Sequence, residues 1–488
     1  RRIGLYMERF VAYKDERWSW PALPDTVPRF ISALQSVSVN DVQPKQQYSI
    51  FPSASVTQDQ IDGKTNYRAG ADFFWRPSTN LQLTATINPD FGVAESDDVV
   101  INLSATETFF PEKRLFFLEG QDVFTASPRA DTRGAGVGNK GAPYTLVNTR
   151  RIGGKPVLPV LGAGESARTK DQIQPNDLLG AVKVTGQSGQ IRYGVLAAFE
   201  DDPEFLVQGA QGSRRVVGAG SDYGVARVLF EDQPGGAYKS FGLLSTMVLN
   251  KAGDALVQSL DGHYLGENGK FKADAQVFTS DKDGVDRGFG GFVDFEYAFR
   301  QGVTQRLGIE YFDDAVDVSD LGFLQRNDNF RIRQAHTRTR SDLSWARSNQ
   351  LDVRGFVQKN AEDLFTQGGL FISNQSVLNN LSQVVLRLDL LAASYDDLNS
   401  FGNGTYRVEA RQMASVGWAS NRSKPLSLGG KLGYQGEELG GDSYVYSLYA
   451  TWRPDDRLVL DVMLNYLDRS AWLLHSRDRT MSTFDAEQ

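Results

Sequence analysis

The sequence predicts an all-β protein, a large antiparallel transmembrane β-barrel of about 18–22 strands that holds an internal plug segment. Three observations predict this fold. Apolar and polar residues alternate over many segments, short and long connections alternate between the segments, and aromatic residues stand at the segment ends. A period of two that recurs many times is typical of strands with lipid on one face and water on the other.

Two segments show the alternation most clearly. One face of residues 289–300 carries Phe289, Gly291, Val293, Phe295, Tyr297 and Phe299, whereas the other carries Gly290, Phe292, Asp294, Glu296 and Arg300. Phe292 is the only large apolar residue on the charged face. Residues 443–454 repeat the pattern, with Tyr444, Tyr446, Leu448, Ala450 and Trp452 on one face. We assign the aromatic faces to lipid and the charged faces to the lumen.

The alternation divides the chain into regions. Residues 1–47 do not alternate and are predicted to be an N-terminal periplasmic linker with short amphipathic helices at 3–13 and 30–37. Residues 48–488 are predicted to be the barrel, in which residues 88–175 interrupt the pattern as an insertion. The chain starts Arg1-Arg2 without Met or a signal peptide, so we expect a mature or clipped piece, with the closing strands beyond Gln488.

The connections divide into two groups. Tight turns are predicted at 76–80, 188–189, 267–269, 301–302 and 454–456, and long polar loops at 201–221, 281–288, 313–328, 394–404 and 436–442. Aromatic residues flank both groups, as expected where amphipathic rings meet the headgroups at two membrane interfaces. The arrangement predicts a protein of the Gram-negative outer membrane with short turns at one end and long loops at the other.

Composition narrows the alternatives. No run of about 18 apolar residues occurs, which excludes a helical membrane protein. The chain has 488 residues, no cysteine and a formal charge of −8, and this charge argues against a nucleic-acid partner. A large soluble all-β protein with one solvated face per sheet is the remaining structural alternative. Outer-membrane lipid is the partner that the pattern predicts, and the oligomeric state stays open.

The insertion contains the most distinctive local sequence. A short helix is predicted at 99–110, and the run Phe109-Phe110-Pro111-Glu112-Lys113-Arg114-Leu115-Phe116-Phe117-Leu118-Glu119-Gly120 follows. Four phenylalanines and four charges are costly to expose together, so we expect them to fold into the barrel as a plug. Its predicted residues are Phe109, Phe110, Pro111, Glu112, Lys113, Arg114, Phe116, Phe117, Glu119 and Gly120. Lys113 and Arg114 are expected to pair with inward acids such as Asp72, Asp294 or Glu296.

This run, together with Arg150-Arg151-Ile152-Gly153, resembles a family of bacterial outer-membrane barrels of unknown function. The resemblance covers nearly the whole chain and implies fold and location rather than an activity. In that family the barrel usually follows a periplasmic domain similar to family-nine carbohydrate-binding modules, which is absent from this sequence. Two departures stand out, because the family often has Pro at the position of Leu115 and Ser at that of Thr149.

Candidate chemistry is sparse. The three histidines, His263, His336 and His475, have no metal-ligand spacing. His263 is the best nominee for a serine-hydrolase triad, and a lumen histidine is the alternative. Residues 281–286 have the oxygen density of a calcium loop but lack the distal Glu of an EF-hand. We therefore expect no catalytic residue, metal or cofactor.

The lumen is predicted to carry charges of both signs with no long stripe of one sign. Arg68, Asp72, Asp294, Glu296 and Arg300 are the principal predicted lumen charges. The sequence thus predicts a plugged channel that passes or binds a solute, with a saccharide among the solutes considered, and no catalysis. The alternative is a blocked-lumen surface scaffold or receptor that serves a periplasmic carbohydrate-binding-like domain or protein partners.

Overall fold

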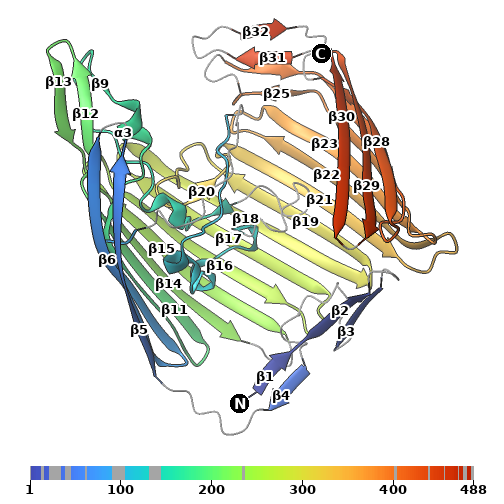
Figure 1. Cartoon of the computed structure of the whole chain (residues 1–488), viewed down its shortest axis with the longest axis horizontal. Helices are drawn as coiled ribbons and strands as arrows, with labels where there is room; N and C mark the ends of the chain where they lie inside the picture. Colours follow the sequence, from blue (N-terminus) through green and yellow to red (C-terminus); the bar gives the residue numbers. More distant parts are fainter. Residues whose placement is uncertain are drawn as a thin grey trace.

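The computed structural model describes residues 2–11, 16–20, 35–38, 46–60, 63–90, 105–130, 144–232, 237–399, 404–437, 440–455, 457–470, 472–475 and 481–484. Nineteen strands form one antiparallel sheet that curves around a hollow (Figure 1). In sheet order these strands are β5 (Gln47–Asp59), β6 (Lys64–Ser78), β7 (Leu81–Ile87), β10 (Leu178–Ser188), β11 (Ile191–Glu200), β14 (Asp222–Asp232), β15 (Tyr238–Leu249), β16 (Ala255–Leu265), β17 (Phe271–Lys282), β18 (Val285–Arg300), β19 (Val303–Phe312), β21 (Asn329–Arg340), β22 (Ala346–Lys359), β23 (Phe365–Leu378), β24 (Gln383–Leu391), β27 (Arg411–Ala419), β28 (Leu426–Gly436), β29 (Asp442–Asp455) and β30 (Leu458–Arg469).

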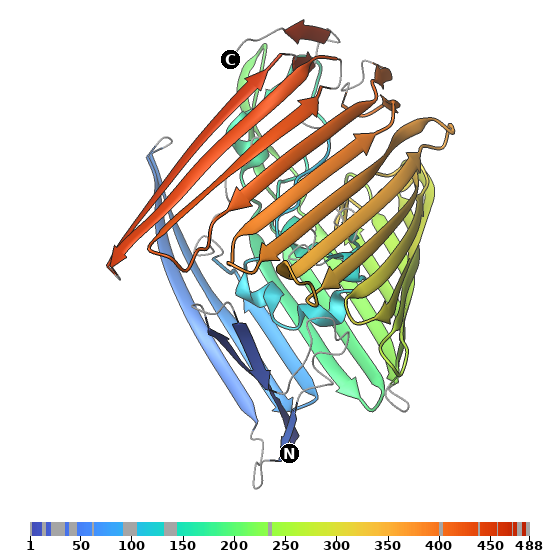
Figure 2. The same cartoon turned by 90° about the vertical axis from the view of Figure 1, so that its right-hand side faces the viewer.

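The sheet has the strand order of a barrel, but its two end strands are not paired. Antiparallel register runs without a break from β5 to β30, whereas no register joins β30 to β5 among the described residues. These end strands stand apart in Figure 1, and Figure 2 shows the tilt of the strands between them. The strand number lies in the predicted range, whereas the expected closed cylinder with an even count is not formed here.

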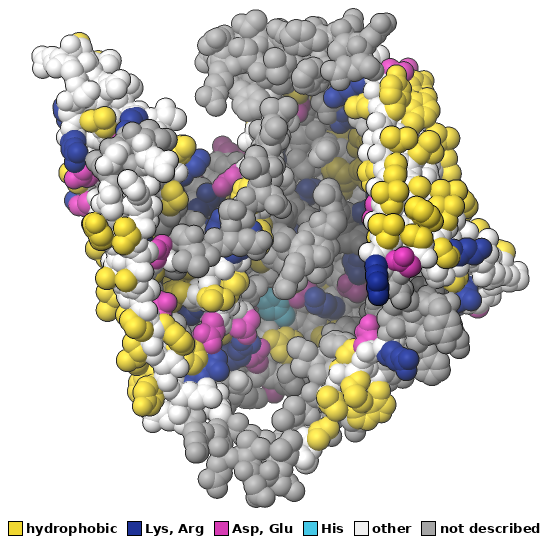
Figure 3. All heavy atoms as spheres, viewed as in Figure 1, with side chains coloured by type: hydrophobic (Ala, Val, Ile, Leu, Met, Phe, Trp, Pro, Cys, Tyr) yellow, Lys and Arg dark blue, Asp and Glu magenta, His cyan; other side chains and the backbone are white. Residues whose placement is uncertain are grey.

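The two faces of the sheet follow the predicted alternation. Tyr67, Leu448 and Phe299 point outward and are 80%, 64% and 55% exposed, whereas the inward Phe292 is 5% exposed. Apolar side chains cover the outer side of the edge strands in Figure 3, and charged side chains gather in the hollow. The prediction of an apolar outside and a charged inside is therefore confirmed for the sheet.

The insertion leaves the sheet after β7 and rejoins it at β10. Its described elements are α1 (Leu115–Leu118), α2 (Gln121–Phe124), η2 (Pro128–Ala130), β8 (Tyr144–Thr145), η4 (Thr149–Arg151), β9 (Ser166–Ala167) and α3 (Thr169–Ile173). The helix predicted at 99–110 is not found over residues 105–110, and residues 99–104 lie outside the described residues. Figure 1 shows α1 and α2 inside the curve of the sheet.

Short strands occupy the longer connections. β12 (Glu204–Gly209) and β13 (Gly212–Val217) form a hairpin that also pairs with β9. β20 (Phe323–Leu324) pairs with β8, and β25 (Ser394–Asp396) pairs with β26 (Tyr406–Val408). The β8–β20 pair links the insertion to the loop between β19 and β21. Among the described residues, no helix has the length and apolar character needed to cross a membrane.

Two local predictions are corrected by the structure. Residues 2–11 contain the strands β1 (Arg2–Leu5) and β2 (Met7–Val11) in place of the helix expected at 3–13, and β3 (Glu16–Trp20) follows. The strand β4 (Gln35–Ser38) replaces the end of the helix expected at 30–37, whose residues 30–34 lie outside the described residues. β1 pairs with β4 and β2 with β3, because a helix of this length is marginal whereas strand pairing supplies backbone partners. The loop predicted at 281–288 is a tight turn at Asp283-Gly284, where Gly284 has a φ of +80°. β31 (Trp472–His475) and β32 (Met481–Phe484) form a separate hairpin.

Candidate functional site

The insertion is held together by a buried arginine–carboxylate pair. The Arg114 guanidinium donates from Nε and Nη2 to the two Glu112 carboxylate oxygens at 2.9 and 2.7 Å. It also donates to the backbone oxygens of Ile152 and Thr149, and the Thr149 hydroxyl donates to Glu112 at 2.7 Å. Burial alone would raise the pKa of Glu112, but the hydrogen bonds and charge of Arg114 hold this pKa below its ordinary value.

These contacts join the two sequence runs that carry the family resemblance. Glu112 and Arg114 belong to the first run, whereas Thr149 and Ile152 lie at the second, and the four form one hydrogen-bonded unit. A serine hydroxyl in place of Thr149 would donate to Glu112 in the same way. Leu115 begins α1 and is 83% exposed, a position where proline is well tolerated. Both departures from the family pattern are therefore structurally conservative.

The α1 segment is fixed to the inner wall by a lysine. Phe116 and Phe117 are buried, and the Lys183 ammonium of β10 donates to the backbone oxygens of Phe116 and Glu119. These carbonyls lack partners within so short a helix, so Lys183 satisfies groups that burial would otherwise leave unpaired. Gly120 has a φ of +68°, and a Cβ there would lie 3.3 Å from the Thr185 hydroxyl oxygen. Glycine permits this close approach.

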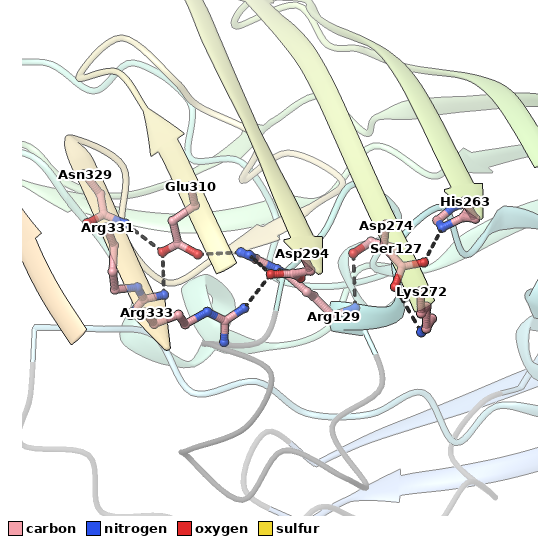
Figure 4. Close-up of polar contacts among 10 residues, drawn as sticks. All are labelled: Ser127, Arg129, His263, Lys272, Asp274, Asp294, Glu310, Asn329, Arg331 and Arg333. Atoms are coloured by element: carbon pink, nitrogen blue, oxygen red, sulfur yellow. Dashed lines mark hydrogen bonds and ion pairs between the residues drawn. The ribbon is translucent and has the colours of Figure 1, made fainter. Parts of the chain in front are cut away.

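A second arginine of the insertion, Arg129 in η2, binds two acids of the wall (Figure 4). Its Nε and Nη2 donate to the two Asp294 carboxylate oxygens, both at 2.7 Å, and Nη1 donates to Glu310. The guanidinium lies 4.0 Å from the centre of the Phe292 ring. Its side chain is only 2% exposed. Because two carboxylates and one aromatic ring of the wall contact this cation, Arg129 anchors the insertion to β18 and β19.

The wall supplies further partners to the same acids. Arg331 of β21 pairs with Glu310, Arg333 lies 3.1 Å from an Asp294 oxygen, and the Asn329 amide donates to Glu310 at 2.9 Å. We call Arg129, Asp294, Glu310, Arg331 and Arg333 the Arg129 anchor. Three guanidinium groups and two carboxylates share this site, so removal of Arg129 would leave the buried Glu310 with fewer counter-charges.

An aromatic cluster surrounds the anchor. Tyr144 of β8 is 2% exposed and packs between Phe278, Phe292 and Phe312, with ring centres 5.9, 5.6 and 5.6 Å away. The three phenylalanines come from β17, β18 and β19 and all point inward. Phe292, the apolar exception on a charged face, is thus explained by its contacts with both Tyr144 and Arg129. The insertion and this part of the wall share one hydrophobic core.

His263 lies in a neighbouring charge network on the inner wall. Its Nδ1 is 2.8 Å from an Asp274 oxygen and its Nε2 is 3.1 Å from an Asp261 oxygen. Asp261 also binds Arg227, and Asp274 binds Lys272 at 2.9 Å. A triad histidine needs one ring nitrogen directed at the nucleophile, whereas here both nitrogens face carboxylates. His336 lies on β21 beside Gln305, and the side chain of His475 lies outside the described residues.

A cavity of about 270 Å³ lies beside the Arg129 anchor. Arg129, Tyr144 and Glu310 form one side, whereas the other side comes from strands β22, β23 and β27 and from the loop that contains β25. Arg326 closes part of the lining through two 2.7 Å hydrogen bonds to Asp397. The residues that line the cavity are mainly charged, amide and hydroxyl side chains, so it is suited to a polar molecule.

The structure corrects the predicted pairing of the plug motif. Arg114 binds Glu112 inside the insertion rather than a wall acid, and Asp294 is bound by Arg129 instead. The motif also includes Phe109, whose ring meets that of Phe323 edge-on at 4.9 Å, and Glu119, which binds Arg76 at 2.8 Å. Phe110 and Lys113 are half-buried, and Pro111 is exposed.

The predicted lumen charges fall into different environments. Arg68 binds Asp177, and Glu296 accepts from Arg306 at 2.8 Å. Asp72 and Arg300 are exposed. Sequence reasoning did not predict the contact group of Arg129, Tyr144 and Glu310, because these residues come from segments that are far apart in sequence. The apolar Phe292 on a charged face was the available signal of a contact with another segment. No group of potential metal ligands occurs among the described residues.

The chain belongs to a family described as a domain of unknown function (DUF5916), whose model matches residues 47–476. No match was found among curated proteins. Solved structures of the ferric enterobactin receptor of Pseudomonas aeruginosa, one a mutant and one a mutant in complex with enterobactin, align at 9% identity and a TM-score of 0.35. The alignments cover 87% of this chain and 75% or 76% of those chains. A similarity of this size does not define a ligand.

Proposed function

We propose that this protein is an integral outer-membrane β-barrel whose insertion acts as a plug and whose lumen passes or binds a polar solute without catalysis. The observation that supports the proposal most is the division of the sheet into an apolar outer face and a charged inner face that binds the insertion. Lipid is the solvent that makes such an outer face favourable, because apolar side chains in water carry a cost that hydrocarbon removes.

The outer face has the dimensions of a membrane-spanning wall. Tyr444 and Trp452 lie on the outer face at opposite ends of β29. A separation of eight residues on a strand tilted by about 45° spans roughly 19 Å, close to the apolar band of outer-membrane barrels. Strand edges cannot face lipid unpaired, so β5 and β30 must both be paired in the membrane.

Contacts between the insertion and the inner wall support a role of the insertion in controlling the lumen. Its contacts with the wall include the Arg129 anchor, the Lys183 contacts and the Tyr144 cluster, all on the inner side of β10–β21. The cavity beside the anchor offers a solute polar partners, and a saccharide remains one prediction for its occupant. The charge network around His263 occupies both ring nitrogens, which supports a non-catalytic role.

Conductance in planar bilayers tests the proposal. The protein should be folded into bilayers with and without deletion of residues 89–143, and Arg215→Gln should serve as a control on an exposed hairpin. We expect small or intermittent conductance from the full chain and large steady conductance after the deletion. Absence of conductance from both forms, with correct folding shown by circular dichroism, would contradict the channel.

The extensive hydrophobic packing of the insertion favours a second candidate. Tyr144, Phe116 and Phe117 belong to one core with the wall, which suits a permanently filled lumen. The protein would then be a surface scaffold or receptor for a periplasmic carbohydrate-binding-like domain or a protein partner. This candidate predicts no conductance from either the full chain or the variant that lacks residues 89–143.

A further inference from the structure

The inner wall formed by β21–β28 carries far more basic than acidic side chains. Strand register assigns alternate residues of each strand to the hollow, and the charged members of this inward set can be read from it. The basic ones are Arg331, Arg333, Arg354, Arg387, Arg411 and Lys431, and the acidic ones are Asp352 and Asp389. This wall therefore has a positive excess, which the sequence alone did not reveal.

The basic residues are spread along the strands rather than clustered at one level. Register places Arg333 and Arg411 in one cross-strand row through Phe356, Gly369 and Leu391. Each following row, two residues further along the strands, contributes one cation, first Arg354, then Arg387, then Lys431. Two residues correspond to roughly 7 Å along a strand, and neighbouring strands lie about 4.8 Å apart, so cations that are one row and two strands apart, such as Arg354 and Arg387, are separated by roughly 12 Å at the backbone. We call the six basic residues Arg331, Arg333, Arg411, Arg354, Arg387 and Lys431 the basic track.

The basic track starts at the cavity and continues toward the short-turn end of the sheet. Arg331 and Arg411 line the cavity beside the Arg129 anchor. Arg331 and Arg333 pair with Glu310 and Asp294, which are acids of the neighbouring strands. Further along, Arg354, Arg387 and Lys431 form no ion pair with a described residue, and the buried Nε of Arg354 has no hydrogen-bond partner among them. Asp389 lies in the register row of Arg354, and Asp352 accepts hydrogen bonds from Thr337 and Gln350.

We propose that the basic track binds and conducts small oxyanion-bearing solutes, such as carboxylates, sulfates or phosphates, which makes the lumen anion-selective. Guanidinium groups match the geometry of these anions through paired N–H donors, and successive cations at this spacing let an anion move from one partner to the next. A lumen wall of one sign also raises the local concentration of the opposite ion. This inference rests on the proposed function for conduction, whereas anion binding stands without it.

Binding is tested first, because it needs no conductance. The probe is a fluorescent pyrene trisulfonate, titrated against the folded protein in neutral-detergent micelles and followed by fluorescence anisotropy, with a pyrene trimethylammonium salt as the cationic comparator. We expect the trisulfonate to bind saturably and the trimethylammonium salt not to bind. Inorganic phosphate should displace the bound trisulfonate. The variant Arg354→Gln/Arg387→Gln/Lys431→Gln should raise the dissociation constant by about tenfold or more, because three attractions to the anion are lost.

A matched control removes the same charge elsewhere. Arg215→Gln/Lys251→Gln/Arg287→Gln neutralises three basic side chains that are 64%, 79% and 62% exposed and lie off the basic track. It should leave the dissociation constant of the trisulfonate within about twofold. Equal binding of the two probes, or equal loss in both triple variants, would overturn the proposal. Circular dichroism and heat-modifiable gel mobility identify any variant that fails to fold, and the single change Arg387→Gln then replaces the triple variant.

Selectivity is measured next as the reversal potential in a potassium chloride gradient. We expect chloride to permeate better than potassium, and the track variant to lower this preference several-fold. Conductance without anion preference would overturn the inference while leaving the proposed channel intact. Anion binding without any conductance would instead refute the channel and leave the basic track as an anion-binding surface.

Discussion

The two halves of the inner wall differ in how their inward charged side chains are paired. On β10–β19, which we call the packed half, inward cations and anions neutralise one another, as in the pairs Arg227–Asp261 and Arg306–Glu296, and the insertion packs on part of this surface. On β21–β28, the basic half, Arg387 and Lys431 are exposed, and Asp389 is the described acid whose charge attracts both Arg387 and Arg354. The packed half thus matches its inward charges in close ion pairs, whereas the basic half carries more inward cations than acids. Under the proposed function, we therefore expect the packed half to be structural and the basic half to meet the solute.

The largest contrast is expected between a tyrosine of the insertion that packs on the packed half and a tyrosine beside the cavity. Tyr144→Ala should destabilise the folded protein by about 3–5 kcal/mol, because a buried ring between three phenylalanines leaves a cavity. Tyr395→Ala, at a 41% exposed position beside the cavity, should cost less than about 1 kcal/mol. Denaturant unfolding in detergent micelles measures both free energies.

Tyr144→Phe provides the control for this comparison. The Tyr144 hydroxyl has no hydrogen-bond partner among the described residues, so its removal should change the free energy of unfolding by less than about 1 kcal/mol. Equal effects of the two alanine substitutions would show that the insertion does not pack on the wall as described.

The Arg129 anchor should give the next largest effect. Arg129→Met removes a positive counter-charge from Glu310, whose side chain is 3% exposed. The free energy of unfolding should fall by about 3 kcal/mol in the same measurement. Adding Glu310→Gln should recover part of this loss because the uncompensated charge is removed. Arg215→Met, which breaks an exposed pair with Glu204, should cost less than about 1 kcal/mol. No recovery in the double variant would argue against electrostatic anchoring.

The interior of the insertion should respond to acid. Because the pKa of Glu112 is lower in the folded protein than its ordinary value of 4.5, its stabilising contribution is complete above that value and is lost as the pH falls through the folded pKa. The Lys113 and Arg114 amides donate to Glu112 at 3.0 and 2.9 Å. Hydrogen exchange, corrected for intrinsic rates, should show their protection persisting at pH 4.5 and decreasing at lower pH.

Glu112→Gln tests whether that response comes from the carboxylate. The variant should lose about 1–3 kcal/mol of local protection at neutral pH and show no acid transition at these amides. An unchanged acid transition in Glu112→Gln would assign it to another group.

The smallest effect is expected at the surface hairpin. Glu165 accepts from Arg214 at 2.9 and 2.7 Å, and these hydrogen bonds hold the pKa of Glu165 at about 2. Arg214→Gln should move this pKa toward 4.5, as measured by isotope-edited infrared titration of the carboxylate, with no measurable change in the unfolding transition. A large loss of stability would show that the hairpin supports the wall.

Local sequence pattern was enough to predict the strands, their outward and inward faces and the place where the insertion interrupts them. These features follow from the period of two, which is local: each residue's neighbours at i±2 share its face. The apolar rows containing Phe299 and Leu448 could therefore be assigned without a structure. Short segments such as residues 2–11 were assigned wrongly because a few residues fit a helix and a strand equally well.

The pairing of charged side chains, in contrast, depends on how the chain folds in space. Arg114 and Arg129 are both insertion arginines, and chain folding rather than sequence spacing placed Arg129 over Asp294 and left Arg114 beside Glu112. The basic track likewise depends on cross-strand register, which sets Arg333 level with Arg411 across four strand pairings. Electrostatic interaction depends on distance in space, and the sequence does not contain that distance until the strands have paired.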